Sequence, residues 1–286
     1  MRVYRPQHPI ELALGNSVVD LTTRALVMGI LNRTKDSFFQ EAATFDFDDL
    51  FARAEQLVGD GADLLDIGGV KAGPGDEVSE AEELDRVVPV VTELVRRFDV
   101  PISVDTWRAS VAKAAFVEGA LIGNDISGFS DPQYLAVAAQ HGAAVVATHI
   151  RLRPRVADPT PTYDDVTETV KEFLLERVRR ATSAGVARNR IILDAGLDLG
   201  KTAAQSLQLL RDSDELAALG LPLLLSSSNK TFLGVVFDLP VDERREASLA
   251  ATALGIAAGC RIVRVHDVQG SVRVRDVIDR LLQVTP

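Results

Sequence analysis

Residues 26–38 read LVMGILNRTKDSF and join an apolar run to a polar, charged segment. An unbroken apolar run of this length predicts a parallel strand covered on both faces, because such a strand has no polar side. The run stops at Asn32, and two basic residues and an aspartate follow it. Ligand sites of α/β barrels and open α/β sheets lie at the carboxyl ends of the strands. We therefore expect a ligand site at residues 32–38.

The same unit, a short apolar strand followed by a helical pattern, repeats along the chain. Further strands are predicted at 64–67, 101–104, 121–122, 143–147, 191–193, 223–225 and 261–265, and helices at 46–58, 79–98, 108–118, 133–140, 163–184, 203–219, 243–258 and 271–282. Eight such units predict an α/β fold of the TIM (β/α)8 barrel type. A doubly wound open sheet is the alternative, and it is disfavoured because no Gly-x-Gly-x-x-Gly follows the first strand. Residues 1–24 are turn-rich and predict a short N-terminal hairpin or cap, which leaves 25–286 for the barrel.

The composition excludes several classes of function. A net charge of -10 argues against a nucleic-acid partner, which would need a basic face. No apolar stretch approaches the roughly 18 residues of a membrane helix, and the first residues lack the apolar run of a signal peptide. The single cysteine cannot form an internal disulfide, which fits a reducing compartment. We expect a cytoplasmic protein with a small-molecule ligand, no nucleic-acid partner and no membrane association.

Polar side chains follow nearly every predicted strand. They are Asn32 and Asp36, Asp66, Asp105, Asn124, His149, Asp194, Lys230, and Arg264 with His266. In a barrel these positions converge on one mouth. A lone aspartate after a strand is most often the N-cap of the next helix, and this interpretation suffices for Asp66. The set as a whole favours a binding site, because carboxylates and amides match the polar edge of a heterocycle while Asn, Arg and His match phosphate oxygens.

The motifs at the strand ends resemble those of dihydropteroate synthase. They are MGILN at 28–32 with DSF at 36–38, DIGG at 66–69, SVDT at 103–106, NDISG at 124–128, Asp194-x-Gly196 with Gly200-Lys201, and RVHDV at 264–268. These motifs span nearly the whole chain in the family's order and spacing. The resemblance implies a TIM barrel, a homodimer, and a transferase of folate biosynthesis that joins 6-hydroxymethyl-7,8-dihydropterin pyrophosphate to p-aminobenzoate.

The resemblance also implies a role for each site residue. The pterin would be held by Asp105, Asn124, Asp194 and Lys230, and the pyrophosphate by Asn32, Arg264 and His266. Asn32 would lie near a Mg²⁺ ion, the implied cofactor. Asp36 would help to stabilise the carbocation that remains when pyrophosphate departs, so that Asp36 and Lys230 are the expected catalytic residues.

The departures from the family pattern gather in the half of the site that takes p-aminobenzoate. The second loop reads GGVKAGPG at 68–75 instead of Gly-Gly-Glu-Ser-Thr-Arg-Pro-Gly, and the first loop reads NRTKD at 32–36 instead of Asn-Val-Thr-Pro-Asp. At five positions a single family residue is replaced. Ala72 stands in place of a threonine, Gly73 and Asn229 in place of arginines, Leu199 in place of a phenylalanine and Thr148 in place of a methionine.

These replacements predict a divergent second paralogue that binds a pterin but is inactive or severely impaired in the standard condensation, a pseudoenzyme. Loss of the groups that orient the arylamine removes much of the rate that positioning supplies. The alternative is an active dihydropteroate synthase, or a transferase with another nucleophile, in which Arg33, Lys35 and Lys71 supply replacement cations. A pterin-binding methyltransferase on the same fold is disfavoured, because its cobalamin-bearing partner leaves no trace in the sequence.

Overall fold

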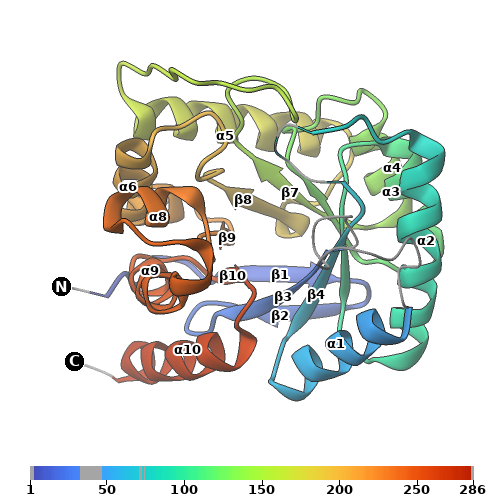
Figure 1. The fold of residues 1–286 in the computed structure, drawn as a ribbon, viewed down its shortest axis with the longest axis horizontal. Coiled ribbons are helices and arrows are strands. Elements are labelled where there is room, and N and C mark those ends of the chain that lie inside the picture. Colours follow the sequence, from blue (N-terminus) through green and yellow to red (C-terminus); the bar gives the residue numbers. More distant parts are fainter. Residues whose placement is uncertain (1–2, 33–46, 71–72, 74, 285–286) are drawn as a thin grey trace.

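The computed structural model describes residues 3–32, 47–70, 73 and 75–284. Within these residues, eight parallel strands close into a barrel that helices surround (Figure 1). The strands are β3 Leu26–Asn32, β4 Leu64–Gly68, β5 Ile102–Asp105, β6 Ile122–Asp125, β7 Ala144–Thr148, β8 Ile191–Asp194, β9 Leu223–Leu225 and β10 Ile262–Val265. The first and last of them, β3 and β10, pair with Leu26 opposite Ile262 and close the ring. The predicted (β/α)8 barrel is confirmed, and the open-sheet alternative is wrong.

The helices follow the strands in chain order. They are α1 Phe47–Gly59, α2 Glu80–Arg97, α3 Ala109–Val117, α4 Tyr134–His141, α5 Val166–Ser183, α6 Ala203–Arg211, α7 Ser213–Ala217, α8 Thr231–Phe237, α9 Arg245–Ala257 and α10 Val268–Gln283. Short 3-10 turns lie at Arg188–Arg190 and Val241–Glu243. In the described residues, no helix combines the length and the apolarity that crossing a membrane requires.

Several predicted helix boundaries are wrong, and side-chain caps account for two of them. The helix predicted from residue 163 begins after Asp165, whose carboxylate accepts the Glu168 N–H at 3.0 Å. The last helix begins three residues early because Asp267 accepts the Gly270 N–H at 2.9 Å. The single helix predicted at 203–219 is interrupted at Asp212 and forms α6 and α7. The sequence analysis missed α8 altogether, because its seven residues, TFLGVVF, show no polar face.

The core has two parts, because successive strand residues face alternately outward and inward. Outward residues such as Val27, Leu65 and Val104 pack under the helices. A smaller cluster fills the lower interior, where Met28 and Ile122 are among the barrel residues that pack with apolar side chains of the N-terminal segment. The mouth above this cluster is left to the polar residues at the strand ends.

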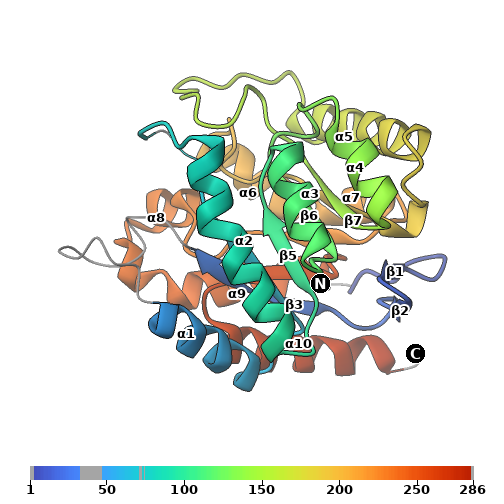
Figure 2. The ribbon, with the colours of Figure 1, turned by 90° about the vertical axis from the view of Figure 1, so that its right-hand side faces the viewer.

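An N-terminal hairpin, β1 Glu11–Leu14 and β2 Ser17–Asp20, lies at one edge of the molecule, on the same side as the C-terminus (Figure 2). Its residues Leu12 and Leu14 join the lower interior cluster. Arg190 ties the hairpin to the barrel by donating to the carbonyls of Gly15 at 2.7 Å and Gly142 at 2.6 Å. The hairpin therefore covers the end of the barrel opposite to the strand ends that carry the site.

Candidate active site

The strand ends bring the predicted site residues into the mouth of the barrel. Asp105 and Asn124 lie opposite each other at the ends of β5 and β6. Arg264 reaches across from β10 and donates to Asp105 through Nη2 at 3.0 Å. Asp194 ends β8, and Lys230 follows β9. Hydrogen bonds connect Asp66, Asp105, Asn124 and Arg264, while Asp194, Lys230 and His266 lie at neighbouring strand ends of the same mouth.

Asp66 lies at the centre of this group, and the prediction that it caps a helix is wrong. It is fully buried within β4, whereas α2 is capped by Ser79, whose side chain accepts the Glu82 N–H. Asp66 accepts hydrogen bonds from Ser103 Oγ at 2.5 Å, from Arg264 Nε at 2.6 Å and from Asn124 Nδ2 at 3.3 Å. The sequence carried one signal for this position, the placement of Asp66 inside rather than after an apolar run. Its hydrogen-bond partners lie on three other strands, so the sequence around Asp66 could not reveal them.

Asp105 and Arg264 form the charged centre of the floor. Burial raises the pKa of Asp105 above its usual range, and the Arg264 guanidinium opposes this shift. A guanidinium has five N–H donors, and Arg264 commits Nε to Asp66 and one Nη2 hydrogen to Asp105. Its other donors have no partner among the residues that the structure describes.

Asp194 and Lys230 form the opposite wall. The Asp194 carboxylate accepts the Gly196 N–H at 2.7 Å through Oδ1, and Lys230 Nζ donates to the Leu197 carbonyl at 2.9 Å. Burial raises the pKa of Asp194 and lowers the pKa of Lys230, since each charge is held away from solvent. One carboxylate oxygen and two ammonium hydrogens are left without a partner among the described residues.

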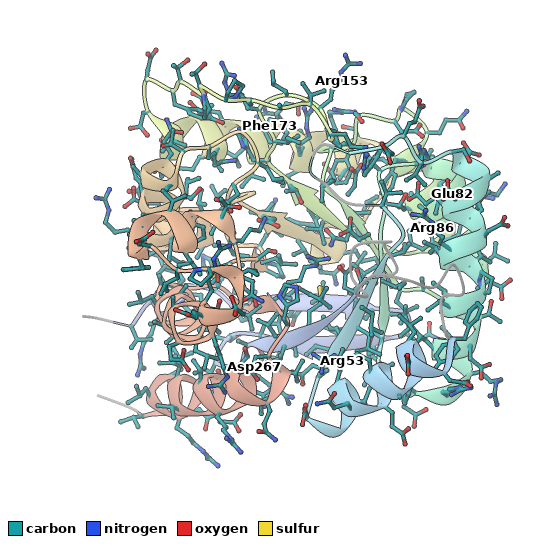
Figure 3. The ribbon with its side chains drawn as sticks, viewed as in Figure 1. Arg53, Glu82, Arg86, Arg153, Phe173 and Asp267 are labelled. Carbon is teal, nitrogen blue, oxygen red and sulfur yellow. The ribbon has the colours of Figure 1, made fainter. Side chains whose placement is uncertain are left out.

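His266 is held at the end of β10 by contacts on both sides. Its Nδ1 lies 3.0 Å from Ser228 Oγ, and its backbone carbonyl accepts from Arg53 of α1 at 2.8 Å. Figure 3 shows Arg53 next to Asp267, where α1 approaches the start of α10. Burial and the neighbouring cation of Arg264 lower the pKa of His266 to about 4. The ring is therefore neutral at pH 7 and can donate one hydrogen bond to an anion without carrying a charge.

His149, predicted from the sequence among the residues of the mouth, instead forms a buried pair with Lys201, a residue for which the sequence predicted no separate role. Lys201 Nζ lies 2.8 Å from His149 Nδ1 and donates to the carbonyls of Gly196 at 2.8 Å and Leu199 at 3.1 Å. Burial lowers the pKa of Lys201 to about 7 and that of His149 to about 3. The pair joins the segment after β7 to the segment after β8, and so supports the backbone that carries Asp194. The Gly200-Lys201 motif was the available signal, because a glycine at φ +65° lets the chain turn the lysine inward.

Comparison with known proteins agrees with this architecture. The family model described as "Pterin binding enzyme" matches residues 28–266. The chain is 41% identical over 268 residues to dihydropteroate synthase of Bacillus subtilis, covering 93% of this chain and 92% of that protein. The chain belongs to the dihydropteroate synthase family. The resemblance seen in the strand-end motifs is therefore confirmed.

Other members of the dihydropteroate synthase family differ in how their activity is described. The chain is 42% identical over 270 residues to "Inactive dihydropteroate synthase 2" of Mycobacterium leprae, covering 92% of each protein. The Yersinia pestis synthase in its sulfonamide drug complex superposes with a TM-score of 0.90 at 37% identity, covering 96% of this chain and 100% of that one. The Xanthomonas albilineans synthase in complex with 7,8-dihydropteroate gives 0.85 at 34% identity, with the same coverage. Relatives named as dihydropteroate synthases and relatives named as inactive are about equally similar to this chain. Overall identity therefore does not decide whether the chain is catalytically active, and that question depends on the residues of the site.

The structure shows where two of the replaced family residues lie. Asn229, at the position of the family's arginine, adopts φ +58°, and its backbone N–H donates to Ser248 Oγ of α9 at 3.0 Å. Its side-chain oxygen lies 3.4 Å from the same hydroxyl, whose one hydrogen is donated to the Arg244 carbonyl at 2.6 Å, so the side chain faces α9. In the segment after β8, Asp198 stands where the family motif has a glycine, and its carboxylate accepts the Phe232 N–H of α8 at 3.2 Å. Both side chains contact neighbouring helices, and Asn229 places no cation in the mouth at the position of the family's arginine.

The described ends of the family's second loop are held by two arginines of the helix layer. Arg86 donates to the Gly69 carbonyl at 2.7 Å, and Arg108 donates to the Val78 carbonyl at 2.7 Å. Glu82 pairs with Arg86, and the two side chains lie next to each other on α2 (Figure 3). The loop is thus anchored at both ends, although its family residues are replaced.

The remaining predicted residues lie outside the described parts of the structure. They are Asp36, Arg33, Lys35, Lys71, Ala72 and the side chain of Asn32. The backbone of Asn32 ends β3, as the sequence predicts. Among the described residues, no group of three His, Cys, Asp or Glu side chains is arranged to hold a metal ion.

Proposed function

We propose that this member of the dihydropteroate synthase family binds a dihydropterin pyrophosphate in the barrel mouth but is inactive, or severely impaired, in condensing it with p-aminobenzoate. One contrast supports both halves of the proposal. The floor residues keep hydrogen-bonding groups that have no partner among the described residues, whereas Asn229, at the position of a family arginine, is an uncharged side chain facing α9, to which its backbone N–H donates.

The pterin half of the site is chemically complete. Asp105, Asn124 and Asp194 each have an oxygen that accepts no hydrogen bond from the described residues, and Lys230 adds free ammonium hydrogens. An aminopyrimidinone ring offers N–H groups to such oxygens and a carbonyl to such an ammonium. The ring would therefore lie across β5, β6 and β8.

The pyrophosphate half would use the free guanidinium donors of Arg264 and the neutral ring of His266. The hard amide oxygen of Asn32 suits Mg²⁺, which keeps several waters and binds through one or two protein groups together with substrate phosphates. The bound ion would neutralise the charge of the departing pyrophosphate.

The arylamine half has lost the groups that hold the nucleophile. Gly73 offers no side chain, and an added Cβ there would meet nothing within 4 Å. Leu199 replaces the family's phenylalanine, and the aliphatic side chain has no aromatic ring to stack on an arylamine. Without an arginine at position 73 or 229, the carboxylate of p-aminobenzoate has no charged partner at the places where the family supplies one.

Two measurements on the purified protein test the proposal. Calorimetric titration with 6-hydroxymethyl-7,8-dihydropterin pyrophosphate and Mg²⁺ should give saturable binding, and a subsequent assay with p-aminobenzoate should give little or no dihydropteroate. Failure to bind the pterin pyrophosphate would refute the first half of the proposal. Turnover comparable to that of the B. subtilis synthase, measured in parallel, would refute the second half and support the active alternative.

A reconstructed variant tests the cause of the impairment. Ala72→Thr, Gly73→Arg and Asn229→Arg restore the missing family side chains together. If their loss explains the impairment, the triple variant should gain turnover while its affinity for the pterin pyrophosphate stays unchanged. A triple variant that binds both ligands yet stays inactive would place the defect elsewhere.

A homodimer is also part of the proposal. Val235 and Phe237 of α8 are 67% and 55% exposed, which agrees with an apolar surface that a second subunit covers. Light scattering should give twice the mass of one chain, and a monomer at micromolar concentration would refute this part.

A further inference from the structure

Asp66 contacts two of the proposed ligand-binding side chains directly. Its Oδ2 accepts from Arg264 Nε at 2.6 Å, and both of its oxygens lie within 3.3–3.4 Å of Asn124 Nδ2. Its Oδ1 accepts from Ser103 Oγ at 2.5 Å. Asp66 is fully buried, and the proposed ligand site lies beyond the side chains that it holds.

The contact with Asp66 decides which way the Asn124 amide faces. A side-chain amide has a donor end and an acceptor end, and a carboxylate in an ion pair can only accept. Nδ2 of Asn124 must therefore face Asp66, and Oδ1 must face away from it. The Asn124 oxygen accepts no hydrogen bond from any described residue. Asp66 thus turns Asn124 into an acceptor toward the mouth.

The neighbouring groups present the same polarity. Asp105 uses Oδ2 for Arg264, and Asp194 uses Oδ1 for the Gly196 N–H, so each keeps one oxygen that accepts from no residue in the described part of the chain. With Asn124 turned as described, three strands each offer an acceptor. A ring that donates hydrogen bonds from its edge fits this surface. If a carbonyl replaces the ring's donor, the carbonyl oxygen faces an acceptor oxygen of the protein. Neither oxygen then has a hydrogen-bond donor, and leaving buried polar groups unpaired weakens binding.

We propose that Asp66 is a positioning residue that fixes the hydrogen-bonding polarity of Asn124 and so makes the site select a 2-aminopteridine over a 2-oxopteridine. This inference rests on the proposed pterin-binding function and deepens it by naming the determinant of ring choice. Asp66 acts through Asn124 and does not touch the ligand.

A pair of probes that differ at one ring position provides the test. Pterin carries an amino group at C2, and lumazine carries a carbonyl there. Calorimetry should show that the protein binds pterin at least about 30-fold more tightly than lumazine, because a site built for a donor rejects an analogue that lacks it. In Asp66→Asn the new amide can donate to Asn124 Oδ1 and turn that side chain over. The pterin-to-lumazine ratio should then fall at least about fivefold.

Ser103→Ala is the matched control, because it removes a hydrogen bond to the same carboxylate without changing the partner of Asn124. Its ratio should equal that of the wild type. Asn124→Ala tests the proposal even if Asp66→Asn does not fold. It should lower the pterin-to-lumazine affinity ratio by as much as Asp66→Asn does. In the double variant, Asp66→Asn should have no further effect on the ratio.

Each outcome gives a decision. An unchanged ratio in Asp66→Asn or in Asn124→Ala, with pterin still bound, would overturn the role of Asp66 and leave pterin binding intact. A further drop of the ratio in the double variant would also overturn it, because Asp66 would then act by a route other than Asn124. A wild-type protein that binds neither probe nor the pterin pyrophosphate would overturn the proposed function and this inference with it.

Discussion

Asp279 gives the stability of this protein a dependence on pH that one substitution should remove. This aspartate lies on α10, is 8% exposed, and accepts the Ala25 N–H at the start of β3 at 3.2 Å. Arg275 is its nearest cation, 4.0 Å away. Burial raises the pKa of Asp279 from 3.8 to about 6, against the opposing effects of the Ala25 N–H and Arg275. The charged form is therefore disfavoured in the folded state.

The sign and the size of the effect follow from that pKa. Between pH 3.8 and about 6 the folded protein binds more protons at Asp279 than the unfolded chain does. Stability must then fall as pH rises through this window and stay at its lower value above it. The full shift corresponds to about 3 kcal/mol, and partial contact with solvent reduces the expected loss to about 1–3 kcal/mol.

Asp279→Asn keeps an acceptor for the Ala25 N–H and removes the charge. Urea unfolding at intervals from pH 3.5 to 7.5 should show the variant more stable than the wild type at pH 7, with the difference shrinking to near zero below pH 4. Asp276→Asn is the matched control, because Asp276 lies on the same helix, pairs with the same arginine and has a side chain that is 61% exposed. Parallel curves for the wild type and Asp279→Asn would refute the reasoning.

Two further predictions concern the packing behind the site. An added Cβ at Gly123 of β6 would lie 2.5 Å from the Tyr134 hydroxyl oxygen and 2.9 Å from Phe116. Gly123→Ala should therefore cost about 1–3 kcal/mol in urea unfolding, and Tyr134→Phe in the same chain should recover part of it, whereas strictly additive effects would contradict this account. Glu83 is fully buried and pairs with Arg108, so Glu83→Ala should lower the free energy of unfolding by about 2–4 kcal/mol, and a loss under 1 kcal/mol would show that the pair is dispensable.

The barrel and most of the site residues could be predicted from the sequence because their signals are local. Each strand is a short apolar run, and each polar residue after a run falls at the same end of a parallel sheet. This argument placed Asp105, Asn124, Asp194 and Lys230 around one mouth without knowledge of their partners.

The role of Asp66 could not be predicted in the same way. A local rule assigned it to a helix cap, whereas its actual partners depend on how β4, β5, β6 and β10 align around the barrel. The direction of the Asn229 side chain depends on Ser248, which lies on another element. The interruption at Asp212 similarly involves Thr167 of α5, whose hydroxyl donates to it at 2.9 Å. Contacts between residues far apart in sequence decided each of these cases.

The pairing of β3 with β10 has a consequence for folding during synthesis on the ribosome. Leu26 leaves the ribosome long before its partner Ile262, because the other six strands of the barrel lie between them in the sequence. At about 5–20 residues per second, β3 waits roughly ten to fifty seconds with one open edge, the state in which a nascent chain is most exposed to wrong pairing. Arg5 donates to the Val284 carbonyl at 2.5 Å, so the segments around these two residues lie side by side. A circular permutant that links these two segments and opens the chain elsewhere would let the two strands emerge in succession and close the ring without the wait.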